Sequence, residues 1–253
     1  MRNQIIDVTR SGALPQGTNS NQVLAALQST YGAQKYTDQQ MLRYPYYSRV
    51  QYPAAGASQI SFFGQSMGQI TELLTNAEQS GALGNVSFLL TGIYFDFWVS
   101  APATTGQPQI YLEDADAIYA DIVHGFAQAG FWELTVGNVK WDSVPIPFLY
   151  RPPSNGRVRT SLNQGGGAFT QSGMSPFAVT GAGTNLCRAD LNRRAWRRGN
   201  LQNPLFLAPQ QNFTAMIYYP SGLIPIIATD VVTGSAVLYV ECTFDGWKYS
   251  PVG

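Results

Sequence analysis

The chain has 253 residues, of which only 12% are charged, and its formal net charge is zero. An average soluble domain has about 25% charged residues, so a chain this poor in charge is expected to have much of its surface covered by other subunits. A net charge of zero excludes a general electrostatic attraction to nucleic acid or to anionic membranes. The length allows one large β domain or two small ones.

Metal and cofactor sites are not expected from this composition. The two cysteines, Cys187 and Cys242, lack metal-ligand spacing, and the chain has a single histidine, His124. No segment approaches the roughly 18 apolar residues that a membrane span needs, and the first residues lack the apolar core of a signal peptide. We therefore expect synthesis in a reducing cytosol, with no metal, no cofactor and no membrane span.

Residues 1–55 are predicted to form an N-terminal arm that begins with polar residues. Ser20 or Asn21 can cap a short helix that ends at Gly32. The apolar side of this helix consists of Val23, Leu24, Leu27 and Tyr31. A second short helical turn is expected after Thr37, so the chain has one or two short helices in this region.

Residues 43–53 have neither the helical nor the strand period, and their prolines oppose pairing in a sheet ladder. An arm has too little core of its own, so its aromatic side chains need a surface, which is either the main domain or a neighbouring subunit. The predicted arm contacts are Tyr44, Tyr46, Tyr47 and Tyr52.

The longest run dominated by β-branched and aromatic residues is 85–100, and it is predicted to be a strand. Its apolar positions alternate as far as Gly92 and then continue one residue out of phase. A bulge or sharp bend at this glycine explains the slip, because glycine has no Cβ to obstruct it. We expect the strand to bend there from one sheet toward another, with its second face meeting another layer or a neighbouring subunit.

The later elements are mainly strands. Residues 114–129 are predicted to form the best helix in the sequence, because apolar residues recur at every fourth position and Gly130 follows. Gly137 and Asn138 indicate a two-residue hairpin turn. The strands around and beyond it are predicted over residues 132–136, 139–142, 144–150, 176–180, 204–207, 212–219, 223–228 and 236–249, and two earlier strands over 59–64 and 109–112. In the strand over 236–249, one face is predicted to consist of Leu238, Val240, Cys242 and Phe244.

About a dozen predicted strands with short connections of the antiparallel type indicate a β-sandwich or barrel. Residues 151–175 are rich in Pro, Gly, Ser, Asn and Gln and are predicted to be a long loop or a subunit contact. The arm is expected to be followed by one domain over residues 56–253. The alternative is two small domains over residues 56–150 and 176–253.

Residues 64–68 match the G-x-S-x-G pattern of a nucleophile elbow, which makes Ser66 the sharpest candidate for catalysis. A serine nucleophile needs a base, and His124 lies inside the predicted helix without the strand and helix alternation of a hydrolase. The acidic residues at 113–121 stand at a helix start, where the helix dipole favours carboxylates. No catalytic residue is therefore expected, and the chain is predicted not to be an enzyme.

One local concentration of charge stands out, and it is rich in arginine. It consists of Arg188, Arg193, Arg194, Trp196, Arg197 and Arg198. Guanidinium groups pair well with carboxylates and phosphates, so this cluster is expected to contact acidic residues of a neighbouring subunit or the phosphates of a packaged genome. The alternative is a solvated helical face with the tryptophan under the arginine stems.

Several stretches resemble the jelly-roll capsid proteins of tailless icosahedral bacteriophages. They are the Tyr- and Pro-rich arm, residues 75–83 before one long strand, residues 203–213 before another, and residues 238–247 at the end. The resemblance covers roughly residues 57–250. It implies an antiparallel jelly-roll β-sandwich, with a single elaborated jelly roll favoured and a double jelly roll as the alternative.

The same resemblance implies a viral structural protein, a capsid or coat subunit that self-assembles into an icosahedral shell. It would be assembled in the host cytoplasm and found in the virion, with copies of itself, other virion proteins and packaged nucleic acid as partners. A second hypothesis is a carbohydrate-binding or adhesin module, since Trp98, Trp141 or Trp247 could stack on sugar rings. A serine esterase using Ser66 is the third.

Overall fold

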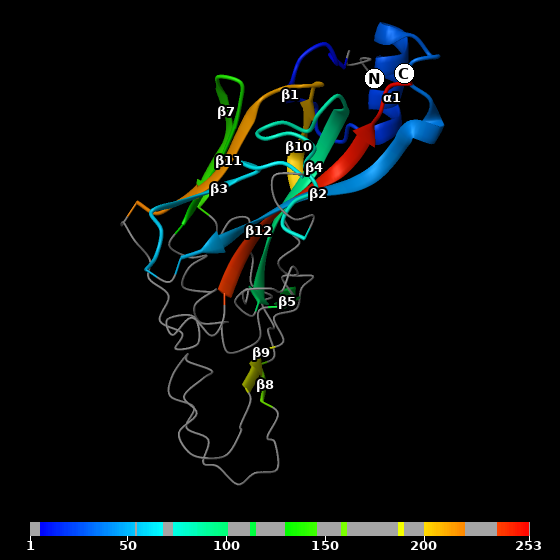
Figure 1. Ribbon diagram of the computed structural model, residues 1–253. Helices are drawn as coiled ribbons and strands as arrows, with labels where there is room; N and C mark the ends of the chain where they lie inside the picture. Colours follow the sequence, from blue (N-terminus) through cyan, green and yellow to red (C-terminus); the bar gives the residue numbers. More distant parts are fainter. Residues whose placement is uncertain are drawn as a thin grey trace, which may run out of the picture.

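The computed structural model describes residues 6–53, 55–67, 73–100, 112–114, 130–145, 158–160, 187–189, 200–220 and 237–252. In this part of the chain the fold is mainly β, with two antiparallel sheets and one α-helix. Figure 1 shows that the helix and both chain ends lie at the same end of the molecule. The described helix is not long and apolar enough to cross a membrane.

The elements in chain order are β1 (Gly12–Ala13), α1 (Ser20–Tyr31), the 3-10 helix η1 (Asp38–Gln40), β2 (Met41–Tyr52), β3 (Gln59–Phe62), β4 (Ser87–Ser100), β5 (Leu112–Asp114), β6 (Phe131–Val136), β7 (Val139–Pro145), β8 (Val158–Thr160), β9 (Cys187–Ala189), β10 (Asn200–Leu207), β11 (Phe213–Tyr218) and β12 (Val237–Tyr249). The larger sheet has the order β1-β10-β4-β12-β2, with β5 paired to the C-terminal end of β4. The smaller sheet has the order β3-β11-β6-β7, and β8 pairs with β9.

Four antiparallel strand pairs are nested within one another along the chain. The innermost is the predicted hairpin of β6 and β7, which turns at Gly137 with a positive φ of 58°. Outside it lie in succession the pairs β4 with β10, β3 with β11, and β2 with β12. Two further pairings, β12 with β4 and β11 with β6, join these pairs into sheets. The chain therefore runs like one long hairpin whose successive pairs alternate between the two sheets.

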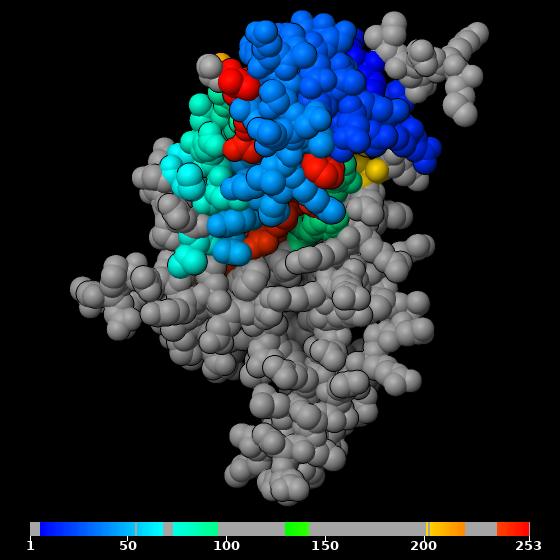
Figure 2. Space-filling view, turned by 90° about the vertical axis from the view of Figure 1, so that its right-hand side faces the viewer, coloured from blue at the N-terminus to red at the C-terminus, as the bar shows by residue number. Residues whose placement is uncertain are grey.

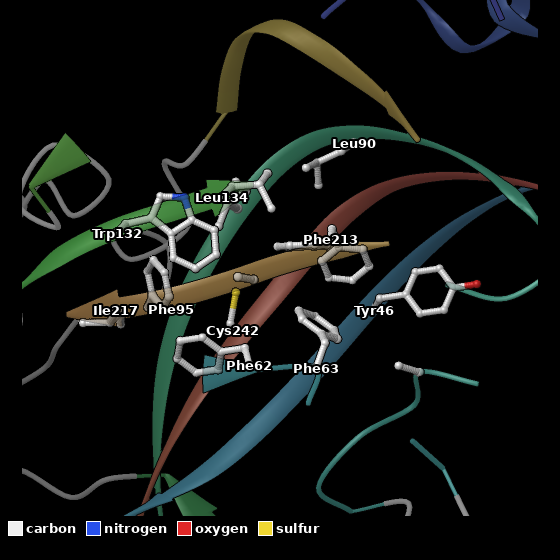
Figure 3. Packing of buried hydrophobic residues seen from close by; sticks show 14 of the residues in the cluster. Tyr46, Phe62, Phe63, Leu90, Phe95, Trp132, Leu134, Phe213, Ile217 and Cys242 are labelled. Atoms are coloured by element: carbon white, nitrogen blue, oxygen red, sulfur yellow. The ribbon is translucent and has the colours of Figure 1, made fainter. Parts of the chain in front are cut away.

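The two sheets share one apolar core, an arrangement compatible with the predicted β-sandwich. β12 contributes the four residues that the sequence placed on one face, Leu238, Val240, Cys242 and Phe244. Trp132 is fully buried, and its ring lies 5.2 Å from that of Phe95 and 6.4 Å from that of Phe62. Figure 3 shows side chains from both sheets pointing toward one another in this core. Burial raises the pKa of the Cys242 thiol, so this residue packs as a small apolar group.

β4 contains the slip predicted from its alternation. Asp245 of β12 pairs with Gly92, and the next residue of β12 pairs with Leu90. Thr91 is therefore an extra residue, and this β-bulge lets the apolar side chains on either side of it face the same core. The prediction that the strand passes from one sheet toward another is wrong, because β4 stays paired with β12 along its whole length.

β2 was not predicted as a strand, and the expectation that its prolines oppose ladder pairing is wrong. β2 pairs with β12 over its whole length and is one of the two outer strands of the larger sheet. The N–H groups of Tyr47 and Arg49 bond to Asn76 and Leu74, so the backbone groups of alternate residues, including Pro45, point away from β12. A proline on the free side of an edge strand loses no ladder bond. The segment predicted as an arm thus contributes a strand to the sheet.

α1 is the predicted N-terminal helix and ends at Gly32 as expected. Its cap is Asn19 and not Ser20 or Asn21, because the Asn19 side chain accepts a hydrogen bond of 3.0 Å from the backbone N–H of Gln22. The Gln22 side chain accepts the Asn19 N–H in return, which completes a capping box.

Residues 6–36 fold back over the outer face of the larger sheet. The apolar side of α1, with Val23, Leu24 and Leu27, is buried, whereas Tyr31 is 39% exposed. The helix lies in a second apolar cluster whose sheet residues include Leu89, Phe206 and Tyr249. In Figure 2 the blue N-terminal segment covers much of the upper part of this face. Part of the surface that the N-terminal segment needs is therefore supplied by its own domain.

Other predicted elements lie wholly or partly outside the described residues. They are the helix over 114–129, the loop over 151–175, and the strands over 109–112, 144–150, 176–180 and 223–228. Asp114, the first residue of the predicted helix, ends the strand β5, and residues 158–160 of the predicted loop form β8. The division into an arm over 1–55 and a domain over 56–253 stays a prediction.

Candidate functional site

The four tyrosines predicted as arm contacts lie on both faces of β2. Tyr46 and Tyr52 are buried in the main core, and Tyr44 is half-buried against it. Tyr47 belongs to the opposite face, where the guanidinium carbon of Arg49 lies 4.7 Å from its ring centre. Tyr46 and Tyr52 thus contact the core of their own chain. Of the four tyrosines, only Tyr44 and Tyr47 are exposed enough to contact a neighbouring subunit.

Burial changes the acid-base behaviour of several tyrosines. Loss of hydration raises the pKa of Tyr46, Tyr52, Tyr239 and Tyr249 above the usual value near 10. The Tyr249 hydroxyl is further engaged, because it donates a hydrogen bond of 3.0 Å to the carbonyl of Ser20 and so ties β12 to α1.

We expect the free energy of unfolding to fall as the pH rises above about 10, because unfolded tyrosines lose their protons there while the buried ones keep them. The stabilisation is complete below this pH and is lost as the pH approaches the raised pKa values. Urea unfolding at pH 8 to 11, with tyrosinate absorbance recorded in parallel, checks this. Full tyrosine ionisation near pH 10 without loss of stability would contradict it.

The outer face of β2 and β12 carries a nearly buried ion pair. Arg49 Nε lies 2.5 Å from Glu241 Oε2, and the two side chains are only 15% and 10% exposed. The Thr243 hydroxyl donates to the second carboxylate oxygen at 2.8 Å, and the guanidinium also donates to the Leu73 carbonyl. The pair therefore ties together the two strands and the segment that begins at residue 73.

A second ion pair on the same two strands is much more exposed. Arg43 donates to Asp245 at 2.7 Å, with the arginine side chain 65% exposed. Exposed pairs contribute little to stability but remain available to a partner. We call Arg43, Tyr47, Arg49, Glu241 and Asp245 the outer-face cluster. Its charges are balanced and its aromatic ring is half-buried, which suits a contact surface better than a catalytic centre.

The outer face of the smaller sheet is a second candidate contact surface. The rings of Phe131 and Tyr218 are stacked with centroids 5.6 Å apart. Lys140 Nζ lies 2.5 Å from Glu133 Oε2, and this hydrogen bond raises the pKa of the lysine. Both pairs join neighbouring strands of this sheet.

A lysine closes the end of the main core near the chain termini. Lys248 Nζ lies 5.3 Å from the ring centre of Tyr44 and 5.8 Å from that of Tyr46, and 3.3 Å from Glu78 Oε1. The lysine side chain is only 19% exposed. Cation–π contacts and the ion pair together allow this charge to lie at the mouth of an apolar core.

Most of the arginine cluster lies outside the described residues. The backbone of Arg188 lies in β9, and Arg193, Arg194, Trp196, Arg197 and Arg198 lie outside the described residues. Its contact with a neighbouring subunit or a genome stays a prediction. His124 also lies outside the described residues, so the pairing of Ser66 with a base is not placed.

The described residues hold no group of three or more His, Cys, Asp or Glu side chains that could bind a metal ion. Two of the tryptophans considered for sugar stacking pack inside the fold. Trp141 is half-buried against the main core beside Gly12, and Trp247 packs on the second cluster. The side chain of Trp98 lies outside the described part.

Sequence reasoning missed Arg49, Glu241 and Asn76 as a connected group. A weak signal was present, since Arg43, Tyr47 and Arg49 all fall at odd-numbered positions and would share one face of a strand. The signal was outweighed by Pro45 and Pro53. The partner Glu241 lies 192 positions away, so only the register of β2 on β12 brings the pair together.

Comparisons of the chain with protein-family models, with curated proteins and with solved structures found no match.

Proposed function

We propose that the protein is a virion structural protein, a capsid or coat subunit built on a single jelly roll that self-assembles into a shell. It acts by packing against copies of itself and other virion proteins, without catalytic turnover. Its place would be the virion, after assembly in the host cytoplasm. The order of the nested strand pairs is the observation that carries the proposal.

A jelly roll is a long antiparallel hairpin of eight strands rolled so that its strand pairs alternate between two sheets. Numbered along the chain, β2, β3, β4, β6, β7, β10, β11 and β12 are strands one to eight. The larger sheet then reads 6-3-8-1 and the smaller sheet 2-7-4-5. A jelly roll has the same strand order, so these pairings support the proposed topology. This architecture occurs in viral capsid domains, and also in lectins and cupins.

The same pairings favour a single jelly roll over a double one. Two jelly rolls over 56–150 and 176–253 would each pair strands within their own half. Here β3 pairs with β11 and β4 pairs with both β10 and β12. These ladders cross the expected boundary, so one set of eight strands accounts for both sheets.

The distribution of charge favours protein partners for the described surface. Five of its cations form ion pairs with carboxylates, namely Arg10, Arg43, Arg49, Lys140 and Lys248. Lys35 lies over the ring of Tyr31, 5.5 Å from its centre. A phosphate-binding patch needs cations that are free to release counterions. A genome contact, if the protein makes one, is therefore assigned to the arginine cluster.

Assembly of the purified full-length chain tests the proposal. We expect sedimentation velocity to show large closed species that appear above a threshold concentration, and electron microscopy to show shells of uniform diameter. A protein that remains monomeric at high concentration over a range of salt, both alone and with other proteins of its particle, would contradict the proposal. Binding to a glycan array by such a monomer would support the carbohydrate-binding alternative.

A further inference from the structure

The free edge of β2 is covered by residues 73–77, which are not a strand of either sheet. An outer strand presents backbone N–H and C=O groups that can pair with a strand of another molecule. β2 would present such groups at Pro45, Tyr47 and Arg49, on the side away from β12. Figure 2 shows β2 and the cyan segment that follows β3 on the same face of the molecule.

Residues 74–76 satisfy these groups one by one. The Asn76 side chain accepts the N–H of Tyr47 at 2.7 Å and donates to the carbonyl of Pro45 at 2.8 Å. The Arg49 N–H donates to the carbonyl of Leu74 at 2.7 Å. The carbonyl of Tyr47 accepts from the Thr75 hydroxyl at 3.0 Å. The Asn76 N–H also donates to the carbonyl of Tyr47 at 3.3 Å. Residues 74–76 therefore form an isolated antiparallel β-bridge with β2, between Ser48 and Thr75, and the Asn76 side-chain amide extends this pairing to Pro45.

The covering segment is itself held firmly. Thr75 and Ala77 are fully buried, and the N–H of Met67 donates to the carbonyl of Ala77 at 2.7 Å. The guanidinium of Arg49 also donates to the carbonyl of Leu73. The ion pair with Glu241 therefore anchors the segment through Arg49.

β7, one of the two outer strands of the smaller sheet, is protected by different means. In β7 the register shifts at Trp141, which makes a bulge, and the strand carries Lys140 and ends at Pro145. A bulge, a lysine and a proline each oppose pairing of an edge strand with another molecule. β2 carries Pro45 but is long and regular, so it needs a cover.

We propose that residues 73–77 are an edge guard that prevents β2 from pairing with β2 of a second copy of this chain. Without the guard, two β2 strands can pair antiparallel about a two-fold axis at Tyr47. In that register each Tyr47 N–H faces the partner Tyr47 carbonyl, and each Arg49 N–H faces the partner Pro45 carbonyl. The guard thereby restricts contacts between copies to side-chain surfaces. This inference does not depend on the proposed function.

The test uses Asn76→Ala, which removes both amide hydrogen bonds, with Asn19→Ala as the matched control. Asn19 also bonds a backbone N–H through its side chain, but at the cap of α1, away from the β2 edge. We expect Asn76→Ala to self-associate at a concentration about tenfold lower than the wild type, from the loss of two hydrogen bonds. Asn19→Ala is expected to lose stability without added association. Sedimentation velocity at concentrations where the wild type is monomeric measures this.

A second substitution identifies the surface used. Tyr47→Pro in the Asn76→Ala background removes the central N–H of the exposed edge, so the added association should disappear. Tyr47→Ala in the same background removes the side chain from the outer-face cluster but keeps the N–H, so its added association should persist. Asn76→Asp keeps the oxygen that accepts from the Tyr47 N–H but loses the N–H group that donates to the Pro45 carbonyl. We expect its association to lie between those of the wild type and Asn76→Ala, and this variant replaces Asn76→Ala in the test if Asn76→Ala does not fold. Equal association of Asn76→Ala and Asn19→Ala, or association that survives Tyr47→Pro, would overturn the proposal.

Discussion

Replacing Gly246 by alanine is expected to lower the free energy of unfolding by about 3 kcal/mol or more, or to prevent folding. A Cβ at this position would collide with the backbone carbonyl oxygen of Leu89 and lie 2.8 Å from the Phe88 ring. The carbonyl cannot move aside easily, because Phe88 is packed in the main core and Leu89 in the second cluster. The close approach occurs where β12 passes the bulge in β4.

Gly64→Ala is the matched control for this prediction. A Cβ at Gly64 would meet nothing within 4 Å. Both substitutions reduce the freedom of the unfolded chain equally, so the difference between them reports the collision in the folded state. We expect Gly64→Ala to change the free energy of unfolding by about 1 kcal/mol or less. Urea unfolding followed by tryptophan fluorescence measures both, and equal stabilities would show that β4 and β12 do not approach as described.

Removing one partner of the nearly buried Arg49–Glu241 ion pair is expected to cause the second large loss in the free energy of unfolding. Arg49→Leu leaves the Glu241 carboxylate at 10% exposure with the Thr243 hydroxyl as its remaining described donor. Breaking a buried pair costs about 3 kcal/mol because a charge is left without compensation. The effect reaches beyond the pair, since Arg49 also holds residue 73 and thus the edge guard.

A double-mutant cycle separates these contributions. In Arg49→Leu/Glu241→Leu no charge is left uncompensated, so we expect most of the lost stability to return. Arg43→Leu is the control on the same strands, and its exposed pair with Asp245 should be worth under about 1 kcal/mol. Free energies of unfolding that simply add in the cycle would show that Arg49 and Glu241 do not interact as the geometry indicates.

The cycle also bears on the edge guard. If Arg49 anchors residues 73–77, Arg49→Leu should associate more than Arg43→Leu. Arg49→Leu/Glu241→Leu should do so too, although most of its stability has returned. Sedimentation of these variants alongside Asn76→Ala compares them. The comparison tests whether the nearly buried Arg49–Glu241 ion pair affects pairing at the sheet edge.

Local features of this protein were predictable from the sequence because they depend on neighbouring residues alone. The alternation along β12 placed its four inward residues correctly, and the phase change in β4 revealed the bulge at Gly92. Gly137 marked the hairpin of β6 and β7, since few residues other than glycine adopt its positive φ. Each of these signals is carried by a short stretch of chain.

The tertiary structure decided what depends on distant partners. Pro45 is compatible with a strand only because β12 pairs with the other side of β2, a fact that local sequence does not contain. The same register buries Tyr46 and Tyr52, which had been predicted as contacts, and it brings Arg49 to Glu241. Composition and periodicity indicate which face of a strand is apolar, but the register of each strand pair determines which side chains are in contact. The nested order of strand pairs, on which the proposed function rests, is likewise a property of the folded chain.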